Sequence, residues 1–283
     1  MKAPAFDYVR PRTLPEVFAL MADHGDDARL LAGGQTLLAT LNMRLSEPAL
    51  LIDIGRVDAL KGITVEGDML RIGALATHRE IEESAMVAEH APLLTMAAPH
   101  IAHRAIRNRG TFGGSIAYAD PSAEWPVCLV VLEGTVVVRG VDGERRIAAR
   151  DFFVDLYTTD LRDGELIVAC ELPLRTEPDV CAFDELARRH GDYAIVGLAM
   201  AARRGAEGMI RMRLAYLGVG TVPFRPLETE RLLESGPMTD DTIEQAIDLL
   251  KTELDPMGDM TSSADTKRHL ACVLARRMLK AIR

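Results

Sequence analysis

Two short glycine segments constrain this chain more than any other feature of its sequence. Residues 32–36 read AGGQT and residues 111–115 read TFGGS, so each places a Gly-Gly pair beside hydroxyl or amide side chains. Glycine has no Cβ atom, so the backbone can adopt positive φ and another group can approach closely. Neither segment has the spacing of the standard phosphate-binding motifs G-x-G-x-x-G or G-x-x-x-x-G-K-[ST].

The residues around the first segment predict a compact α/β unit. A capping box at residues 13–16 predicts a helix. A short apolar strand at 28–32 then leads through the glycines to a second helix, which has Leu37, Leu38, Leu41 and Leu45 at helical spacing. A buried strand follows at 49–54. Strand, glycine turn, helix and strand form one supersecondary unit.

The next part of the chain predicts further strands and helices. Strands are predicted at residues 69–77, 135–139, 145–149 and 165–174, the second and third being joined by the hairpin signal GVDG. Helices are predicted near 78–84, 88–100 and 122–133, with the second glycine segment lying in a loop between the last two.

A domain boundary is predicted in the polar, proline-containing stretch 175–180. Beyond it, residues 192–203 and 209–220 read as an antiparallel pair of strands. Helices are then predicted at 227–235, 240–254 and 263–282. A sheet covered by helices gives an α+β fold, and 283 residues suit about two domains.

Charge and composition exclude several classes of function. The formal net charge is −9, from 33 basic and 42 acidic residues, which argues against non-specific nucleic-acid binding. No run approaches the roughly 18 apolar residues of a transmembrane helix, and the first residues lack the apolar core of a signal peptide. We therefore expect a cytoplasmic protein with no transmembrane segment and no nucleic-acid partner.

The cysteines and histidines do not predict a metal site. No two of the four cysteines have C-x-x-C spacing, so we expect buried free thiols and neither zinc nor an iron–sulfur cluster held by this chain. His100 and His103 lie three residues apart but lack a third ligand nearby.

Together, the two glycine segments suggest a binding site for an anion. Successive backbone N–H groups in glycine turns form anion-binding concavities, and Thr36 and Thr111 add hydroxyl donors. Two such segments would suit a diphosphate held from two sides, as in a dinucleotide such as FAD. The alternative is that each Gly-Gly pair only serves the path of the chain.

The sequences AGGQTLL and IRNRGTFGGSIAYADPSAEWP resemble those of the FAD-binding medium subunit of molybdenum hydroxylases, such as carbon monoxide dehydrogenase and xanthine dehydrogenase. The opening FDYVRPRTLPEVFALM and the later ARRHGDYAIVGLA are also similar to that family. The resemblance implies a two-part FAD-binding domain of the vanillyl-alcohol-oxidase (PCMH) type at residues 1–176, with subdomains at about 1–57 and 58–176. A smaller α+β C-terminal domain follows at 177–283.

The resemblance also implies which residues bind FAD. Residues 32–36 and 111–115 would wrap the diphosphate, Glu124 would contact the adenosine end, and Tyr193 would lie beside the isoalloxazine ring. The full set of implied cofactor-binding residues is Leu31, Ala32, Gly33, Gly34, Gln35, Thr36, Leu37, Ile101, Thr111, Gly113, Gly114, Ser115, Glu124, Leu166 and Tyr193. Gln35, Ser115 and Glu124 depart from the commonest family residues but keep their hydrogen-bonding class.

The function implied is electron transfer within an oxidoreductase. FAD would take electrons from a small [2Fe–2S] subunit and pass them to NAD⁺, a quinone or O₂, while hydroxylation occurs on a large molybdenum-cofactor subunit. The expected assembly is a dimer of heterotrimers, and we predict no catalytic residue in this chain. The alternatives are a self-sufficient FAD-dependent oxidase or dehydrogenase and a nucleotide-binding assembly factor.

Several charged residues and one aromatic residue lie outside the implied cofactor-binding set. Arg104, Arg107 and Arg109 form either a solvated basic face or a contact with a partner subunit or the flavin. We interpret Glu82 and Glu83 as a solvated helix face, and Trp125 as a packing residue.

Overall fold

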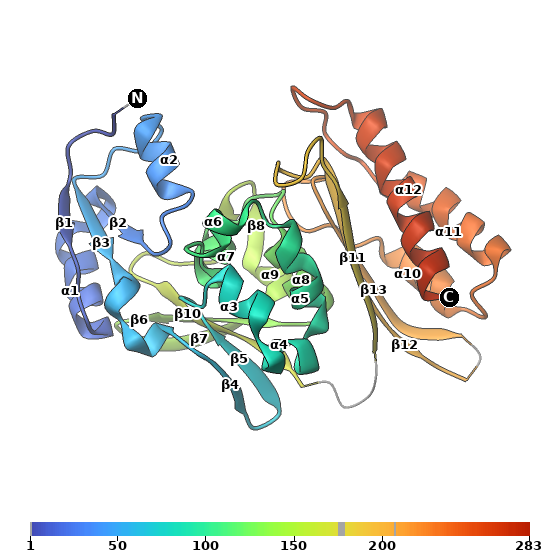
Figure 1. The fold of residues 1–283 in the computed structure, drawn as a ribbon, viewed down its shortest axis with the longest axis horizontal. Coiled ribbons are helices and arrows are strands. Elements are labelled where there is room, and N and C mark those ends of the chain that lie inside the picture. The colour runs from blue at the N-terminus through green and yellow to red at the C-terminus, as the bar shows by residue number, and fades with distance from the viewer. Residues whose placement is uncertain (1, 175–178, 207) are drawn as a thin grey trace.

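The computed structural model describes residues 2–174, 179–206 and 208–283. Three parts follow one another along the chain, and Figure 1 shows them from the N-terminal unit on the left to the C-terminal helices on the right. The predicted boundary near residue 176 lies outside the described residues. Within the described ranges, no helix is long and apolar enough to cross a membrane.

The N-terminal unit is a small parallel sheet with two helices. It contains β1 (Asp7–Val9), α1 (Leu14–His24), β2 (Ala28–Leu31), α2 (Leu37–Asn42) and β3 (Leu50–Asp53). The strand order is β1-β3-β2, with every pairing parallel. Thr13 and Glu16 form the predicted capping box at the start of α1. The predicted order of strand, glycine turn, helix and strand is confirmed, whereas β1 was not predicted.

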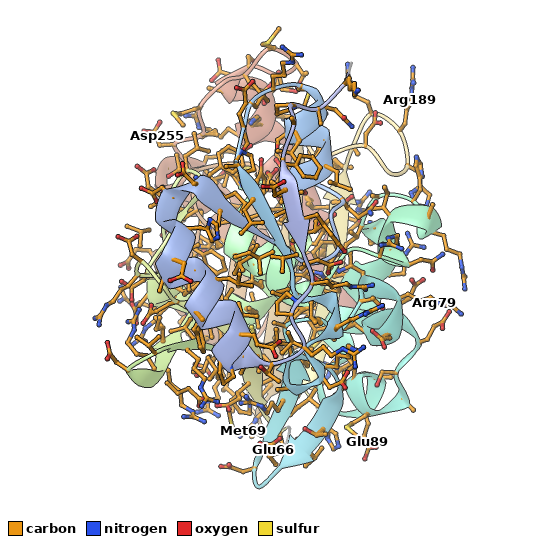
Figure 2. The ribbon with its side chains drawn as sticks, turned by 90° about the vertical axis from the view of Figure 1, so that its left-hand side faces the viewer. Glu66, Met69, Arg79, Glu89, Arg189 and Asp255 are labelled. Atoms are coloured by element: carbon orange, nitrogen blue, oxygen red, sulfur yellow. The ribbon has the colours of Figure 1, made fainter. Side chains whose placement is uncertain are left out.

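The central part packs helices on a five-stranded antiparallel sheet. The sheet order is β4-β5-β10-β6-β7. Its strands are β4 (Ile63–Glu66), β5 (Met69–Gly73), β6 (Thr135–Gly140), β7 (Gly143–Ala148) and β10 (Leu166–Pro173), and a separate hairpin is formed by β8 (Phe153–Asp155) and β9 (Thr158–Thr159). The helices are α3 (His78–Glu83), α4 (Ala85–His90), α5 (Pro92–Ala97), α6 (Arg104–Arg107), α7 (Phe112–Tyr118), α8 (Glu124–Val131) and α9 (Ala149–Phe152). In Figure 2, Glu66 and Met69 mark the outer turn of the β4–β5 hairpin.

Two predictions for this part were wrong in detail. The helix predicted over 88–100 is divided into α4, α5 and a short 3₁₀ turn (Ala98–His100). Proline has no N–H and disfavours a helical residue before it, and Pro92 follows Ala91 at φ −142°. The strand predicted over 69–77 ends at Gly73, because Ala74 and Ala76 accept hydrogen bonds from the start of α7 instead.

The C-terminal part is an antiparallel sheet with helices on one face. The sheet order is β11-β12-β13. Its elements are β11 (Asp179–Leu186), β12 (Val196–Arg204), β13 (Met209–Leu217), α10 (Leu227–Glu234), α11 (Asp240–Glu253) and α12 (Ala264–Ile282). The antiparallel pair β12–β13 and the helices confirm the prediction, whereas β11 was not predicted.

This sheet separates two hydrophobic cores. Ala199 and Ala201 of β12 belong to the core of the central part, which also contains Trp125 of α8. Leu198 and Met200, which point to the other face, belong to the core beneath α11 and α12. Figure 1 shows the sheet standing between the central helices and α10–α12. The C-terminal part is therefore packed firmly against the central part through α5 and α8.

Candidate functional site

The two glycine segments, which are far apart in the sequence, lie against each other. A Cβ atom placed on Gly33 would lie 2.2 Å from the carbonyl oxygen of Arg109 and 2.9 Å from Cα of Gly110. A Cβ atom placed on Gly114 would lie 3.8 Å from Cβ of Ala32. The N-terminal unit therefore contacts the central part at these segments. The two segments lie close together, as the binding of one ligand from two sides would require.

The first segment presents backbone donors at the surface. Gly34 has φ +74°, the left-handed conformation that favours glycine, and residues 31–37 are all half-buried. Within the described ranges, the N–H groups of Gly33, Gly34, Gln35 and Thr36 have no protein acceptor. The amide of Gln35 donates to the carbonyl oxygen of Gly33 at 3.0 Å. Successive free donors of this kind suit an anionic group.

The second segment is the first turn of helix α7, and the predicted open loop is wrong. Thr111 is the N-cap, and its hydroxyl accepts from the N–H of Gly114 at 3.2 Å. The N–H groups of Phe112 and Gly113 donate to the carbonyl oxygens of Ala76 and Ala74 at 2.8 and 2.9 Å. Most donors of this segment are therefore already used within the protein. It contributes a half-buried helix face, at Gly114 and Ser115, rather than a ring of free N–H groups.

A buried histidine, His78, holds the backbone segment that leads into α7. The backbone N–H of His78 donates to the carbonyl oxygen of Gly110 at 3.0 Å, and the indole N–H of Trp125 donates to His78 Nδ1 at 3.0 Å. Burial, with the charge of Arg107 nearby, lowers the pKa of His78 to about 4. A neutral imidazole can accept from Trp125, so the packing role predicted for Trp125 is confirmed. His78 was missed because nothing local in the sequence links it to Gly110.

The three arginines before the second segment have different environments. Arg107 is buried, pairs with Glu82 at 2.8 Å, and donates to the carbonyl oxygen of Ile101 at 3.1 Å. The solvated interpretation is therefore wrong for both Arg107 and Glu82. Arg104 forms an exposed ion pair with Glu83 at 2.9 Å. Arg109 is exposed, and its carbonyl oxygen faces Gly33.

The remaining predicted residues lie around these segments. Ile101 is buried in the central core, and Leu166 is buried in the cluster against which Ala32 packs. Glu124 begins α8 and is half-buried; burial and the nearby Glu185 raise its pKa to about 8.

Tyr193 is exposed on the loop between β11 and β12. Partial burial of its hydroxyl and the nearby Asp120 raise its pKa to about 12, and Glu124 contributes to the same shift. The charge of Glu124 is thus near enough to influence the pKa of Tyr193, although the resemblance assigns these residues to opposite ends of FAD.

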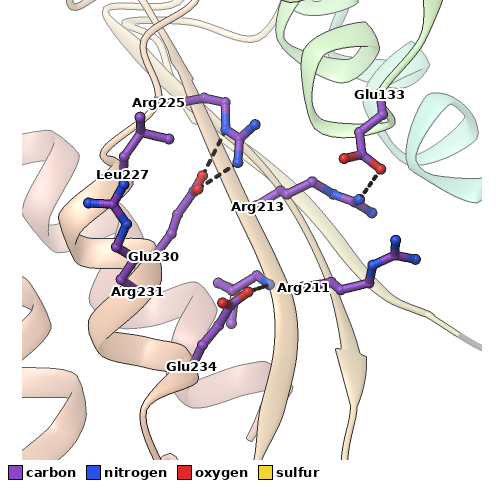
Figure 3. A pocket seen from close by; sticks show the side chains of 9 residues that line it. Glu133, Arg211, Arg213, Arg225, Leu227, Glu230, Arg231 and Glu234 are labelled. Atoms are coloured by element: carbon purple, nitrogen blue, oxygen red, sulfur yellow. Dashed lines mark hydrogen bonds and ion pairs between the residues drawn. The ribbon is translucent and has the colours of Figure 1, made fainter.

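A concave region lies elsewhere on the molecule and contains none of the predicted residues. Figure 3 shows this groove between β13, α10 and the turn after α8. Two of its four arginines pair with its own glutamates, Arg225 with Glu230 at 2.6 Å and Arg213 with Glu133. The four arginines and three glutamates that line it leave little net charge to attract a ligand. In the part of the chain that the structure describes, no group of three or more His, Cys, Asp or Glu residues is arranged to hold a metal ion.

Comparison with known proteins identifies the family of the chain and its cofactor. The family model described as the FAD binding domain in molybdopterin dehydrogenase matches residues 4–175. The model of the CO dehydrogenase flavoprotein C-terminal domain matches residues 181–282. The chain belongs to this flavoprotein family. FAD is the cofactor of the family, as the sequence predicted.

Individual relatives match along the whole chain. The alpha subunit of the 6-hydroxypseudooxynicotine dehydrogenase complex from Paenarthrobacter nicotinovorans is 39% identical, over 99% of this chain and 95% of its own length. A carbon monoxide dehydrogenase structure from Hydrogenophaga pseudoflava, lacking the Mo-pyranopterin moiety, has a TM-score of 0.96 and 34% identity, covering 100% of this chain and 98% of that chain. Quinoline 2-oxidoreductase from Pseudomonas putida 86 has a TM-score of 0.95 and 35% identity, with the same coverage. The predicted family and α+β fold are confirmed, and the relatives are oxidoreductase components.

The geometry of the glycine segments fits FAD. The free N–H groups of the first segment are donors for a diphosphate, and residues 31–37 and 110–118 contain no acidic side chain that would repel it. The half-buried face of α7 adjoins these donors. The individual cofactor-binding residues stay predictions.

Proposed function

We propose that the chain is the FAD-carrying electron-transfer subunit of a molybdenum hydroxylase complex. It relays electrons from a [2Fe–2S] subunit through FAD to an external acceptor, which is NAD⁺, a quinone or O₂. The observation that carries the proposal is the meeting of the two glycine segments at a surface with unused backbone donors. The full-length similarity to flavoprotein subunits of this family supports it.

The chain contributes binding and positioning rather than acid–base chemistry. When bound, FAD supplies reversible redox chemistry that accepts and releases electrons. The N–H groups of residues 33–36 would hold the diphosphate, and the half-buried face of α7 would contact it from the other segment. The other predicted contacts, from Ile101, Glu124, Leu166 and Tyr193, complete the proposed site. Residues 1–176 form the proposed FAD-binding domain, and 177–283 the C-terminal domain.

The proposed partners are a large molybdenum-cofactor subunit and a small [2Fe–2S] subunit, in a dimer of heterotrimers in the cytoplasm. Support comes from the relative that is named as a subunit of a dehydrogenase complex. Exposed apolar side chains on the N-terminal unit, such as Leu45 and Met43, provide surface for such contacts.

Purification with and without partner subunits tests this function. The chain alone should bind one equivalent of FAD but oxidise no organic substrate, because in this proposal the large molybdenum-cofactor subunit oxidises the substrate. Co-expressed with its partners, the same chain should be reduced by the substrate of the complex. Substrate turnover by the lone chain would establish the self-sufficient oxidase or dehydrogenase instead. A colourless chain that takes up no FAD would favour the assembly factor.

A further inference from the structure

The turn after β13 lies where the central and C-terminal parts meet. Gly218, which directly follows Leu217 of β13, is buried and has φ +80°, the left-handed conformation that favours glycine. Its N–H group donates to the carbonyl oxygen of Pro121, between α7 and α8, at 2.9 Å. A Cβ atom placed on Gly218 would lie 2.4 Å from the carbonyl oxygen of Ile195, next to the start of β12. One buried glycine therefore contacts two segments that are far apart in the sequence.

A buried lysine of the last helix also holds this turn. Lys267, near the start of α12, is 9% exposed, and its ammonium group donates to the carbonyl oxygen of Gly218 at 2.9 Å. One helical turn later, the carbonyl oxygen of Ala271 accepts from the hydroxyl of Tyr216 at 3.4 Å. Residues four positions apart share a helix face, so one face of α12 is bonded twice to the end of β13.

Asp259, in the connection between α11 and α12, fixes the ammonium group from its other side. It forms an ion pair with Lys267 at 2.8 Å. Its second carboxylate oxygen accepts from the N–H groups of Thr261 and Ser262 at 2.7 and 2.9 Å. The hydrogen bond from Lys267, together with those from Thr261, holds the pKa of Asp259 well below its usual range. Lysine is almost never fully buried unless it is paired, so these partners specify the position of Lys267.

The two segments that Gly218 contacts lead to residues of the proposed FAD site. Pro121 lies three positions before Glu124, the first residue of α8. Ile195 lies two positions after Tyr193. Glu124 belongs to the central part and Tyr193 to the C-terminal part. The position of Gly218 therefore influences how these two residues are placed relative to each other.

We infer that Lys267 is a positioning residue for FAD and acts through Gly218. In the proposed function, on which this inference rests, Glu124 and Tyr193 contact the cofactor. Loss of the ammonium group leaves the buried carbonyl oxygen of Gly218 without its charged donor, which is unfavourable. The turn then shifts, and the two segments in contact with it shift as well. Helix α12 thereby helps to place residues on both sides of the cofactor.

Lys267→Met in the full chain loaded with FAD tests the inference without any assay of the complex. Methionine keeps most of the apolar stem but has no donor for Gly218. We expect the visible circular dichroism of the bound flavin to change, because this signal depends on the asymmetric surroundings of the ring. The Kd of FAD should rise about tenfold, since a hydrogen bond to a charged group contributes on this scale. Lys267→Arg keeps a charged donor and should restore the dichroism and most of the affinity.

Lys280→Met is the matched control, because it removes the same charge from an exposed position of the same helix. Lys280 pairs only with Glu244, at 3.5 Å, in the part of the chain that the structure describes, so this variant should keep the wild-type dichroism and Kd. An equal change in both Met variants would overturn the inference, since net charge would then be the cause.

Thermal unfolding of each variant separates positioning from stability. A folded Lys267→Met chain with a lower Tm but the wild-type dichroism and Kd would overturn the inference, because Lys267 would then only stabilise the C-terminal part. If that variant does not fold, Lys267→Gln, whose shorter side chain reaches Gly218 less well, is measured against the same expectations, and wild-type values would overturn the inference. Failure of the proposed function looks different, because the wild-type chain would then take up no FAD.

Discussion

Substitution of Gly33 by alanine tests whether the contact between the glycine segments creates the cofactor site. The new Cβ atom would lie 2.2 Å from the carbonyl oxygen of Arg109, 2.9 Å from its carbonyl carbon and 2.9 Å from Cα of Gly110. All three are backbone atoms, which cannot rotate away as a side chain can. Ordinary van der Waals contact begins at 3.4 Å, so the segments must separate by at least 1.2 Å (3.4 minus 2.2).

The magnitude follows from the cost of inserting a methyl group where the packing has no room. Such overpacking costs about 1–3 kcal/mol. If the separation moves the donors of residues 33–36 out of line with the diphosphate, the same free energy is lost from binding. Because a tenfold change in affinity corresponds to about 1.4 kcal/mol, we expect FAD to bind about 5- to 150-fold more weakly.

The assay is titration of the apo-chain with FAD, followed by flavin fluorescence, with circular dichroism to establish folding. Gly236→Ala is the matched control, since a Cβ atom at that position meets nothing within 4 Å, and it should bind FAD as the wild type does. A folded Gly33→Ala chain with the wild-type Kd would refute the reasoning, because the close approach of the segments would then be irrelevant to the cofactor.

Three further outcomes are expected. Gly114→Val should abolish FAD binding, because its methyl groups would fill the gap towards Ala32; a folded variant with full FAD content would contradict the site. Arg107→Met should cost about 3 kcal/mol of stability in urea denaturation, because it leaves Glu82 and three carbonyl groups unpaired, whereas the exposed Arg104→Met should cost less than about 1 kcal/mol. Glu124→Gln should raise the Tm of the apo-chain at pH 9 and leave it unchanged at pH 4. The pKa of Glu124 rises from 4.5 to about 8 on folding, so its contribution to stability is full below pH 4.5 and is lost as the pH approaches 8; equal Tm differences at both pH values would contradict this.

The elements that the sequence predicted well are those specified by local signals. The capping box of α1, the β6–β7 hairpin and the helices of the C-terminal part all depend on residues a few positions apart. Strand β11 lacked such a signal because its sequence, DVCAFDEL, mixes acidic and apolar residues. It is stabilised by distant partners, such as the ion pair between Asp184 and Arg277 of α12.

The helical start of α7 could not be predicted from local propensity. Two consecutive glycines are poor helix formers, since glycine costs about 1 kcal/mol relative to alanine in a helix. The turn forms because Thr111 caps it and because Ala74 and Ala76 accept its first N–H groups. These acceptors are more than 30 residues away in the sequence, so only the folded chain reveals them.

The contacts also explain why glycine is required at several of these positions. A Cβ atom on Gly110 would overlap the ring of His78, at 2.6 Å, and one on Gly113 would overlap Ala74, at 2.5 Å. Gly33 is required by Arg109 in the same way, and Gly34 by its positive φ. Most of these glycines therefore serve contacts within the protein, as the alternative interpretation of the Gly-Gly pairs expects, and the binding of an anion by them stays a prediction.

A consequence follows for the relation between cofactor and fold. Gly33 packs the N-terminal unit against the central part, and the free donors lie beside it in the same segment. A ligand that hydrogen-bonds to the first glycine segment and also contacts α7 can bind fully only when the N-terminal unit is packed against the central part. Such a ligand stabilises the docked arrangement by RT ln(1 + [FAD]/Kd). Bound FAD should therefore protect the α1–α2 unit from proteolysis and hydrogen exchange more than it protects α10–α12, which lie on the far side of the C-terminal sheet (Figure 1).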